Sequence, residues 1–169
     1  MNRVHFSSEN REWETPESVF KPLQKEFNIV LDTCATEENK KTKGYLDRKM
    51  NGLKADWFTI AGLLKGNCWM NPPYGRGIEQ WVQKASQERD KGATVVALLP
   101  ARTDTNWFHN FIHEKEGVEV RFLKGRIKFV DAESSAPFPS MIVIFTPKEK
   151  LNKQTKMWLK YLKLIRAIK

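Results

Sequence analysis

The segment Asn71-Pro72-Pro73-Tyr74 is the part of this chain whose residue types are best suited to chemistry. It follows the short apolar run of residues 68–70, which is typical of a buried strand. The Asn71 side-chain oxygen and the Pro72 carbonyl can both accept hydrogen bonds from one NH2 group, while the Tyr74 ring stacks on the planar system that carries it. The two prolines fix the backbone and add no competing N–H donors. This pattern favours methylation of an amino or amide nitrogen, although an ordinary Pro-Pro turn at a strand end uses the same residues.

The composition indicates one globular domain with an uneven distribution of charge. The 169 residues are 40% hydrophobic, enough for a single core. The net charge is +9, but residues 147–169 hold eight Lys or Arg and one Glu, whereas the rest holds 21 basic and 19 acidic residues. Such a cationic tail favours a polyanion, most naturally nucleic acid.

The sequence predicts neither a membrane-spanning protein nor one held together by disulfide bonds. No stretch reaches the roughly 18 apolar residues that a membrane-spanning helix needs, and the N-terminus has no apolar signal run. The two cysteines, Cys34 and Cys68, form neither a disulfide framework nor a zinc pattern. We therefore expect a protein of the reducing cytoplasm.

The elements that must position the Asn71 segment alternate between helix and strand. After a polar arm at residues 1–12, Thr15 as N-cap and Pro16 at the first helical position open a helix that reaches Phe27. Residues 28–32 form a short strand that ends in Asp32. Further strands are expected at residues 67–70, 93–99, 118–123 and 140–145, and helices at 77–91 and 105–114, the last capped by Thr103 or Asp104. Residues 33–66 are the least regular stretch.

This order predicts an α/β fold with a mixed sheet whose final strand pair is antiparallel. Ligands bind to such sheets outside the carboxyl ends of the strands, where Asp32, Asn71 and residues 100–102 fall. We therefore expect one site. Residues 1–146 form one domain, and residues 147–169 form a basic amphipathic helix that tracks DNA, packs at an interface or lies on a membrane surface.

Seven segments, in this order and spacing, resemble the phage-type DNA N-6-adenine methyltransferases, the Dam-like phage family. The resemblance spans about residues 13–146. It implies a Rossmann-like fold that uses S-adenosylmethionine to methylate the exocyclic N-6 of adenine in double-stranded DNA, with base flipping, in the cytoplasm of a bacterial host. The segments are Trp-Glu-Thr-Pro at 13–16, Leu-Asp-Thr-Cys-Ala-Thr at 31–36, Asn-Gly-Leu at 51–53, Asp-Trp at 56–57, Asn-Pro-Pro-Tyr-Gly at 71–75, Leu-Leu-Pro-Ala-Arg-Thr-Asp at 98–104 and Gly-Arg-Ile-Lys-Phe at 125–129.

The resemblance also implies residues that bind the methyl donor. A helix start at Thr15 suits the donor's carboxylate, and equally suits plain capping. The loop after Asp32 lacks the glycine-rich pattern of the wider class, so Ala35 is its small residue. Asp56 and Trp57 match a pair that contacts the donor's adenine, but an Asp that caps a helix and a Trp in the core would give the same sequence. The full set is Thr15, Pro16, Asp32, Cys34, Ala35, Asp56, Trp57 and Asn71.

Catalysis and DNA binding are assigned to a second set. Asn71 and Pro72 polarise the target amino group, and Tyr74 stacks on the extruded base. Phe129 is the candidate for the opposite face of that base, with core packing as the alternative. Contacts with DNA are assigned to Arg102, Arg126 and Lys128, although Arg102 can instead pair with Asp104 to cap a helix.

Other functions stay open at this stage. The same Asn-Pro-Pro-Tyr pocket accepts the amide of a protein glutamine or an adenine in RNA, and a non-catalytic DNA-binding remnant keeps the same fold. His109 and His113 lie four residues apart beside Glu114, but the third ligand of a zinc site is missing, so no metal is expected. The sequence specifies neither the target site nor the oligomeric state.

Overall fold

Helices and strands alternate along most of the chain. The computed structural model describes residues 13–148, so the predicted polar arm and nearly all of the predicted basic helix lie outside the described residues. The elements are α1 (Glu17–Phe27), β1 (Ile29–Asp32), β2 (Gly44–Tyr45), α2 (Trp57–Leu63), β3 (Asn67–Met70), α3 (Ile78–Lys91), β4 (Val95–Pro100), α4 (Asn106–Phe111), β5 (Val118–Phe122) and β6 (Ser140–Phe145).

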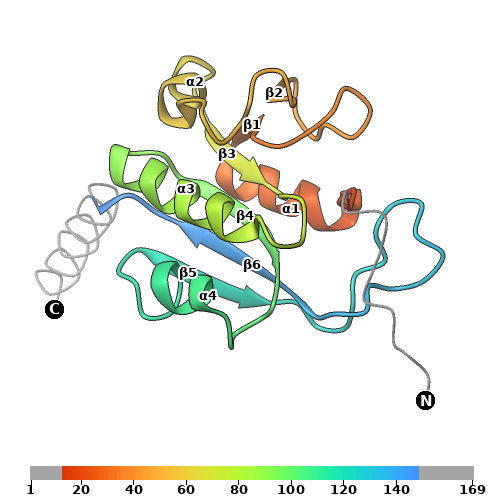
Figure 1. Ribbon diagram of the computed structural model, residues 1–169. Coiled ribbons are helices and arrows are strands. Elements are labelled where there is room, and N and C mark those ends of the chain that lie inside the picture. The colour runs from red at the N-terminus through yellow and green to blue at the C-terminus, as the bar shows by residue number, and fades with distance from the viewer. Residues whose placement is uncertain (1–12, 149–169) are drawn as a thin grey trace, which may run out of the picture.

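The strands form one mixed sheet in the order β2-β1-β3-β4-β6-β5 (Figure 1). The pairs β2–β1, β1–β3 and β3–β4 are parallel. Strand β6 runs antiparallel to both β4 and β5. The predicted mixed sheet with an antiparallel final pair is therefore confirmed.

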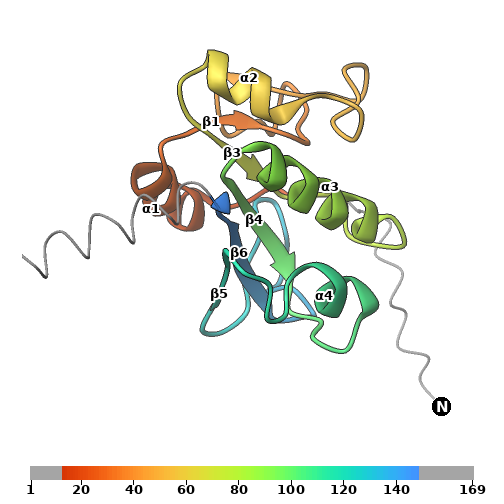
Figure 2. The same cartoon turned by 90° about the vertical axis from the view of Figure 1, so that its left-hand side faces the viewer.

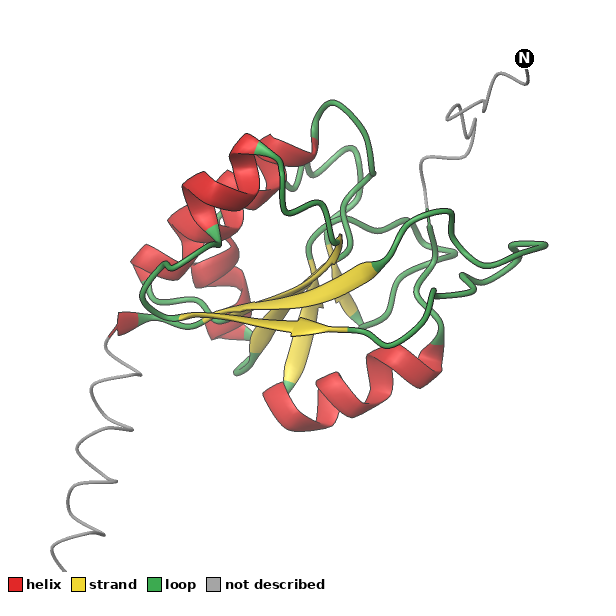
Figure 3. Ribbon diagram, turned by 90° about the horizontal axis from the view of Figure 1, so that it is seen from below, coloured by secondary structure: helices red, strands yellow, loops and turns green. Residues whose placement is uncertain are grey.

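Two layers of helix cover the sheet. In β4, Val95, Ala97 and Leu99 pack with α2, α3 and α4, whereas Val96 and Leu98 pack with α1 and with part of the β5–β6 connection. Figures 2 and 3 accordingly show α1 alone on one face of the sheet and the other three helices on the opposite face. Every residue of β4 is buried, which explains its uninterrupted apolar sequence.

Three local expectations were wrong. The N-cap of α1 is Pro16 rather than Thr15, because the Thr15 side chain turns into the protein and is only 1% exposed. Helix α4 is capped by Thr105 rather than Thr103 or Asp104. Residues 33–66, expected to be irregular, contain β2 and α2. Among residues 13–148, no helix has the length and apolarity to cross a bilayer.

The sheet brings the predicted functional segments to one edge. Asp32 at the end of β1 pairs with Trp69 of β3, and the backbone N–H of Thr33 donates to the Trp69 oxygen at 3.0 Å. The loop after β1 and the Asn71 segment therefore leave adjacent parallel strands in the same direction, as expected for a ligand site at the carboxyl ends.

Candidate active site

A cavity of about 260 Å³ lies at the carboxyl ends of β1 and β3. Four segments line it: Trp13 and Thr15 before α1, the loop after β1, the turn after β2, and residues 71–73 after β3. Trp81 of α3 adds an aromatic side chain to the wall. The predicted site residues Thr15, Asp32, Cys34, Ala35, Asn71 and Pro72 all belong to this lining.

Contacts with the residues before α1 hold the amide of Asn71 in one orientation. Its Nδ2 donates to the Trp13 carbonyl oxygen and to Thr15 Oγ1 at 3.1 Å. Because a carbonyl oxygen can only accept, the nitrogen of the amide must be the atom that faces Trp13. Asn71 Oδ1 is buried and has no hydrogen-bond partner among the described residues. A buried acceptor without a partner is costly, so this atom is well suited to receive an N–H from a ligand.

Asp32 supplies a buried carboxylate to the same cavity. It is 3% exposed and accepts from the backbone N–H groups of Cys34 at 3.4 Å and Lys41 at 3.1 Å. Burial raises the pKa of Asp32 to about 6, against the opposing effect of these hydrogen bonds. A cationic ligand group would relieve the cost of ionising this carboxyl.

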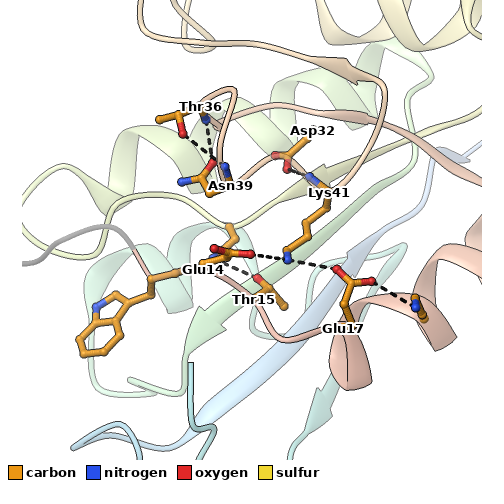
Figure 4. A network of polar contacts seen from close by, with 10 residues as sticks. Glu14, Thr15, Glu17, Asp32, Thr36, Asn39 and Lys41 are labelled. Carbon is orange, nitrogen blue, oxygen red and sulfur yellow. Dashed lines mark hydrogen bonds and ion pairs between the residues drawn. The ribbon is translucent and has the colours of Figure 1, made fainter. Parts of the chain in front are cut away.

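Lys41 ties the loop after β1 to the residues before α1. Its side chain is 6% exposed, and Nζ contacts Glu14 at 2.9 Å and Glu17 at 3.1 Å (Figure 4). Burial alone would lower the pKa of Lys41, but the hydrogen bonds to the two glutamates outweigh burial and raise it. This network holds the residues next to Thr15 against the cavity wall.

The loop itself is ordered by its own side chains rather than by glycines. The Thr36 N–H donates to Asn39 Oδ1 at 2.7 Å, and the Asn39 N–H donates to Thr36 Oγ1 at 3.4 Å (Figure 4).

Burial, together with the charge of Asp32, holds the pKa of the Cys34 thiol well above its usual range. Cys34 is therefore a neutral wall residue.

Three further residues line the cavity but were not predicted as site residues: Asp47, Gly52 and Trp81. The Trp81 ring stacks on Trp57 with centroids 6.2 Å apart and planes 23° apart. A Cβ at Gly52 would lie 2.2 Å from the Thr33 oxygen and 2.9 Å from the Trp81 ring, so only glycine fits there. Asp47 follows β2 as Asp32 ends β1, and its Oδ1 accepts from the Met50 N–H at 2.8 Å. The two-residue β2 has no periodicity in the sequence, so no signal marked this position.

The predicted donor contacts Asp56 and Trp57 lie outside the cavity lining, and so does Pro16. Asp56 caps α2 by accepting from the Thr59 N–H at 3.4 Å, and it contacts Lys91 at 3.6 Å. Trp57 is fully buried in the core, and its Nε1 donates to the Gly52 oxygen at 2.7 Å. Trp57 thus supports the site from behind, whereas Asp56 caps α2.

Tyr74 and Phe129 belong to an aromatic cluster next to the cavity. The Tyr74 hydroxyl donates to the Leu98 oxygen at 3.2 Å, and burial raises its pKa well above the usual value. The Tyr74 ring meets Phe129 and Phe138 edge-on, with centroid distances of 6.3 and 5.5 Å. Phe129 is 2% exposed and lies 5.0 Å from the ring of Trp13. Trp13, rather than Phe129, lines the cavity.

The predicted DNA contacts are exposed and lie outside the cavity. They are Arg102, Arg126 and Lys128; Arg126 Nη1 donates to the Ala136 oxygen at 3.4 Å. The His109 and His113 rings are 5.3 Å apart. Within residues 13–148, no group of three or more His, Cys, Asp or Glu is arranged to hold a metal ion.

Comparison with known proteins agrees with the resemblance seen in the sequence. The family model described as DNA N-6-adenine-methyltransferase (Dam) matches residues 4–162. The DNA N-6-adenine-methyltransferase of Haemophilus phage HP1 (strain HP1c1) is 35% identical over 144 residues, which cover 80% of this chain and 79% of that protein. The protein of the same description from Escherichia phage T1 is 35% identical over 97 residues, 57% of this chain and 38% of that protein. The chain belongs to the DNA N-6-adenine-methyltransferase (Dam) family.

Proposed function

We propose that this enzyme transfers a methyl group from S-adenosylmethionine to the exocyclic N-6 of adenine in double-stranded DNA, on a Rossmann-like methyltransferase fold. The observation that carries the proposal is Asn71 Oδ1, which is buried and has no hydrogen-bond partner in the part of the chain that the structure describes. Trp13 and Thr15 hold the Nδ2 of the same amide, in a cavity that also contains Asp32. Family membership and the names of both phage relatives support adenine in DNA as the target. The antiparallel placement of β6 beside β4 is compatible with the proposed fold.

The lining of the cavity fits the parts of the donor. The Asp32 carboxylate matches its α-ammonium group, and Thr15 lies on the same side of the cavity to meet its carboxylate. Asp47, just past β2, occupies the place where an acidic residue binds ribose hydroxyls in dinucleotide-binding sheets. Trp81 offers a flat wall for the adenine ring. Trp57 then acts indirectly, because its ring supports Trp81.

Asn71 and Pro72 polarise the amino group that receives the methyl group. The lone pair of the adenine amino nitrogen is delocalised into its ring, which makes that nitrogen a poor nucleophile. Two acceptors on its hydrogens, Asn71 Oδ1 and the Pro72 carbonyl, localise the lone pair and stabilise the positive charge that develops. The nitrogen forms a bond to the methyl carbon as the carbon–sulfur bond breaks, and the amino group then loses one proton to water. S-adenosylhomocysteine and N-6-methyladenine are the products.

The target base must leave the duplex to reach this site. Extrusion costs a few kcal/mol, which stacking and hydrogen bonds recover. Asn71 Oδ1 is shielded from solvent by its neighbours, so a side chain must move before the target base can reach it. We assign that movement to the side chain of the half-buried Trp13. Tyr74 and Trp13 provide rings for the base, with Phe129 packed behind them. Arg102, Arg126 and Lys128, together with the basic residues 147–169, would meet phosphates.

Parallel transfer assays test this proposal. Labelled S-adenosylmethionine is offered to unmethylated duplex DNA, RNA and total protein with the wild-type enzyme and Asn71→Ala. Label in duplex DNA that disappears with Asn71→Ala supports the proposal. Label in protein alone would support a glutamine amide methyltransferase, label in RNA alone an RNA enzyme, and no label with intact DNA binding a non-catalytic remnant.

A further inference from the structure

Phe122 is a large apolar side chain left largely in solvent at the end of the edge strand β5. It is 65% exposed, whereas Val118 and Val120 on the same face of the strand pack partly against the core beneath α3 and α4. A single exposed apolar residue is ordinary on a protein surface. Its exposure therefore matters only in combination with its position and its neighbours.

The register of the sheet places Phe122 at the same edge as the cavity. Phe122 pairs with Met141, and Met141 pairs with Leu99, one residue before the carboxyl end of β4. Asn71 directly follows Met70, which pairs with Ala97 of β4. Phe122 is thus separated from Asn71 by three strand spacings, or about 15 Å. That separation is comparable to the width of the DNA major groove, about 12 Å.

Cations without acidic partners surround this position in the sequence and in the sheet. Lys124, Arg126 and Lys128 follow Phe122, and Arg102 follows the end of β4, two strands from β5. None of these four residues forms an ion pair within residues 13–148. Arg121, in contrast, is neutralised by Glu26 at 2.7 Å and Glu119 at 2.6 Å.

The acidic residues of the same connection lie near its middle. Asp131 and Glu133 come after Val130, whose N–H donates to the Glu14 oxygen at 3.0 Å. That contact fixes Val130 next to the residues before α1. Unpaired cations and one exposed aromatic ring therefore occur together at this edge of the sheet, a combination that complements a polyanion with flat bases.

We propose that Phe122 stacks on bases of the duplex beside the extruded adenine, while Lys124 and Arg102 contact the flanking phosphates. The inference rests on the proposed function, because it names the surface by which that activity engages duplex DNA. Apolar side chains that insert between base steps lower the cost of opening a duplex, and stacking of a base on an aromatic ring contributes about 1–3 kcal/mol. Phe122 would thus act on the duplex rather than on the methyl donor.

The test compares Phe122→Ala with a matched control, Leu63→Ala, which truncates the 78%-exposed Leu63 of α2. We expect Phe122→Ala to lower kcat/KM for perfectly paired duplex DNA about tenfold, and to recover most of that loss on a duplex whose adenines face mismatched bases. Phe122→Leu, which keeps an apolar wedge, should retain most of the activity. Affinity for S-adenosylhomocysteine, measured by calorimetry, should stay unchanged, as should every parameter of Leu63→Ala.

Wild-type kcat/KM on paired duplex for Phe122→Ala would overturn the inference and leave the proposed function intact. A fall in molar mass of the variant by light scattering, from dimer to monomer, would also overturn it by assigning Phe122 to self-association. Absence of DNA methylation by the wild-type protein would remove the proposed function, and this inference with it.

Discussion

The side-chain nitrogen of Asn71 donates a hydrogen bond to the main-chain oxygen of Trp13, 58 residues earlier in the chain. This contact joins the carboxyl end of β3 to the segment that precedes α1. The orientation of the proposed catalytic amide is therefore set by residues outside its own motif, and Thr15 Oγ1 completes the arrangement. Changes at those residues should affect turnover without contact with the substrate's reacting atoms.

Thr15→Val should lower kcat measured at a saturating concentration of the methyl donor. The substitution keeps the shape of a side chain that is 1% exposed and removes the oxygen that accepts from Asn71. One lost hydrogen bond of about 0.5–1.5 kcal/mol corresponds to a decrease in kcat of roughly two- to tenfold. Thr59→Val, which removes a hydroxyl that bonds Asp56 on α2, serves as the control in the same kinetic assay. An unchanged kcat in Thr15→Val would show that the hydrogen bond from Asn71 to Thr15 is not needed for catalysis.

Affinity for the methyl donor should depend on pH through Asp32. Its pKa is about 6 without ligand, and only the ionised carboxylate attracts the donor's ammonium. Roughly 90% is ionised at pH 7 and roughly 10% at pH 5, so affinity for S-adenosylhomocysteine should fall about tenfold as the pH falls. Calorimetric titrations across this range check the prediction. Asp32→Asn should bind weakly with no such dependence, and a flat wild-type profile would argue against the ammonium contact.

The raised pKa of Asp32 makes the stability of the ligand-free protein change with pH in the opposite direction to donor affinity. The folded carboxyl, with its pKa above the ordinary value of 3.8, holds its proton more tightly than the unfolded one does. Its contribution to the free energy of unfolding is therefore fully present below about pH 4 and is lost as the pH rises through about 6. Ligand binding and stability without ligand thus change in opposite directions across this window.

Gly52→Ala should weaken both folding and donor binding. The added Cβ would meet the Thr33 oxygen at 2.2 Å and the Trp81 ring at 2.9 Å, so the turn after β2 must shift away from the cavity. We expect a loss of about 1–3 kcal/mol in the free energy of unfolding. Gly62→Ala is the matched control because nothing lies within 4 Å of its added Cβ, and in a helix it should stabilise by about 0.5–1 kcal/mol. Denaturant titrations of both variants distinguish these outcomes, and equal stabilities would contradict the packing at Gly52.

Trp81→Leu should weaken binding of the donor's adenine. Loss of a stacked ring that contributes about 1–3 kcal/mol corresponds to at least a fivefold rise in Kd for S-adenosylhomocysteine. Trp57 remains behind the vacated position, so the fold should persist. Phe58→Leu on the outer surface of α2 is the control. A Kd equal to that of the wild type would place the adenine elsewhere.

Much of the fold could be predicted because long apolar periodicity is a strong signal. The buried run of β4 and the helical spacing in α3 correspond to the observed elements within one or two residues. Strand β2 could not be predicted, since two residues carry no periodicity. Helix α2 was missed because its exposed Phe58 and Leu63 obscure an amphipathic pattern.

The site was predicted where chemistry depends on a local motif, and missed where it depends on tertiary contacts. Asp32 and Asn71 follow strands, so their convergence follows from topology alone. The contact of Trp13 with Asn71 spans five elements, from α1 to β3, and has no local signature. Phe129 and Trp13 are both aromatic, and only the packed cluster distinguishes the ring that lines the cavity from the ring beneath it.

The most direct measurement is mass spectrometry of nucleosides from duplex DNA incubated with S-adenosylmethionine that carries a deuterated methyl group. We expect labelled N-6-methyl-2′-deoxyadenosine with the wild-type protein, and at least a hundredfold less with Asn71→Ala, while affinity for S-adenosylhomocysteine changes little. Label on another base, or undiminished label with Asn71→Ala, would contradict it.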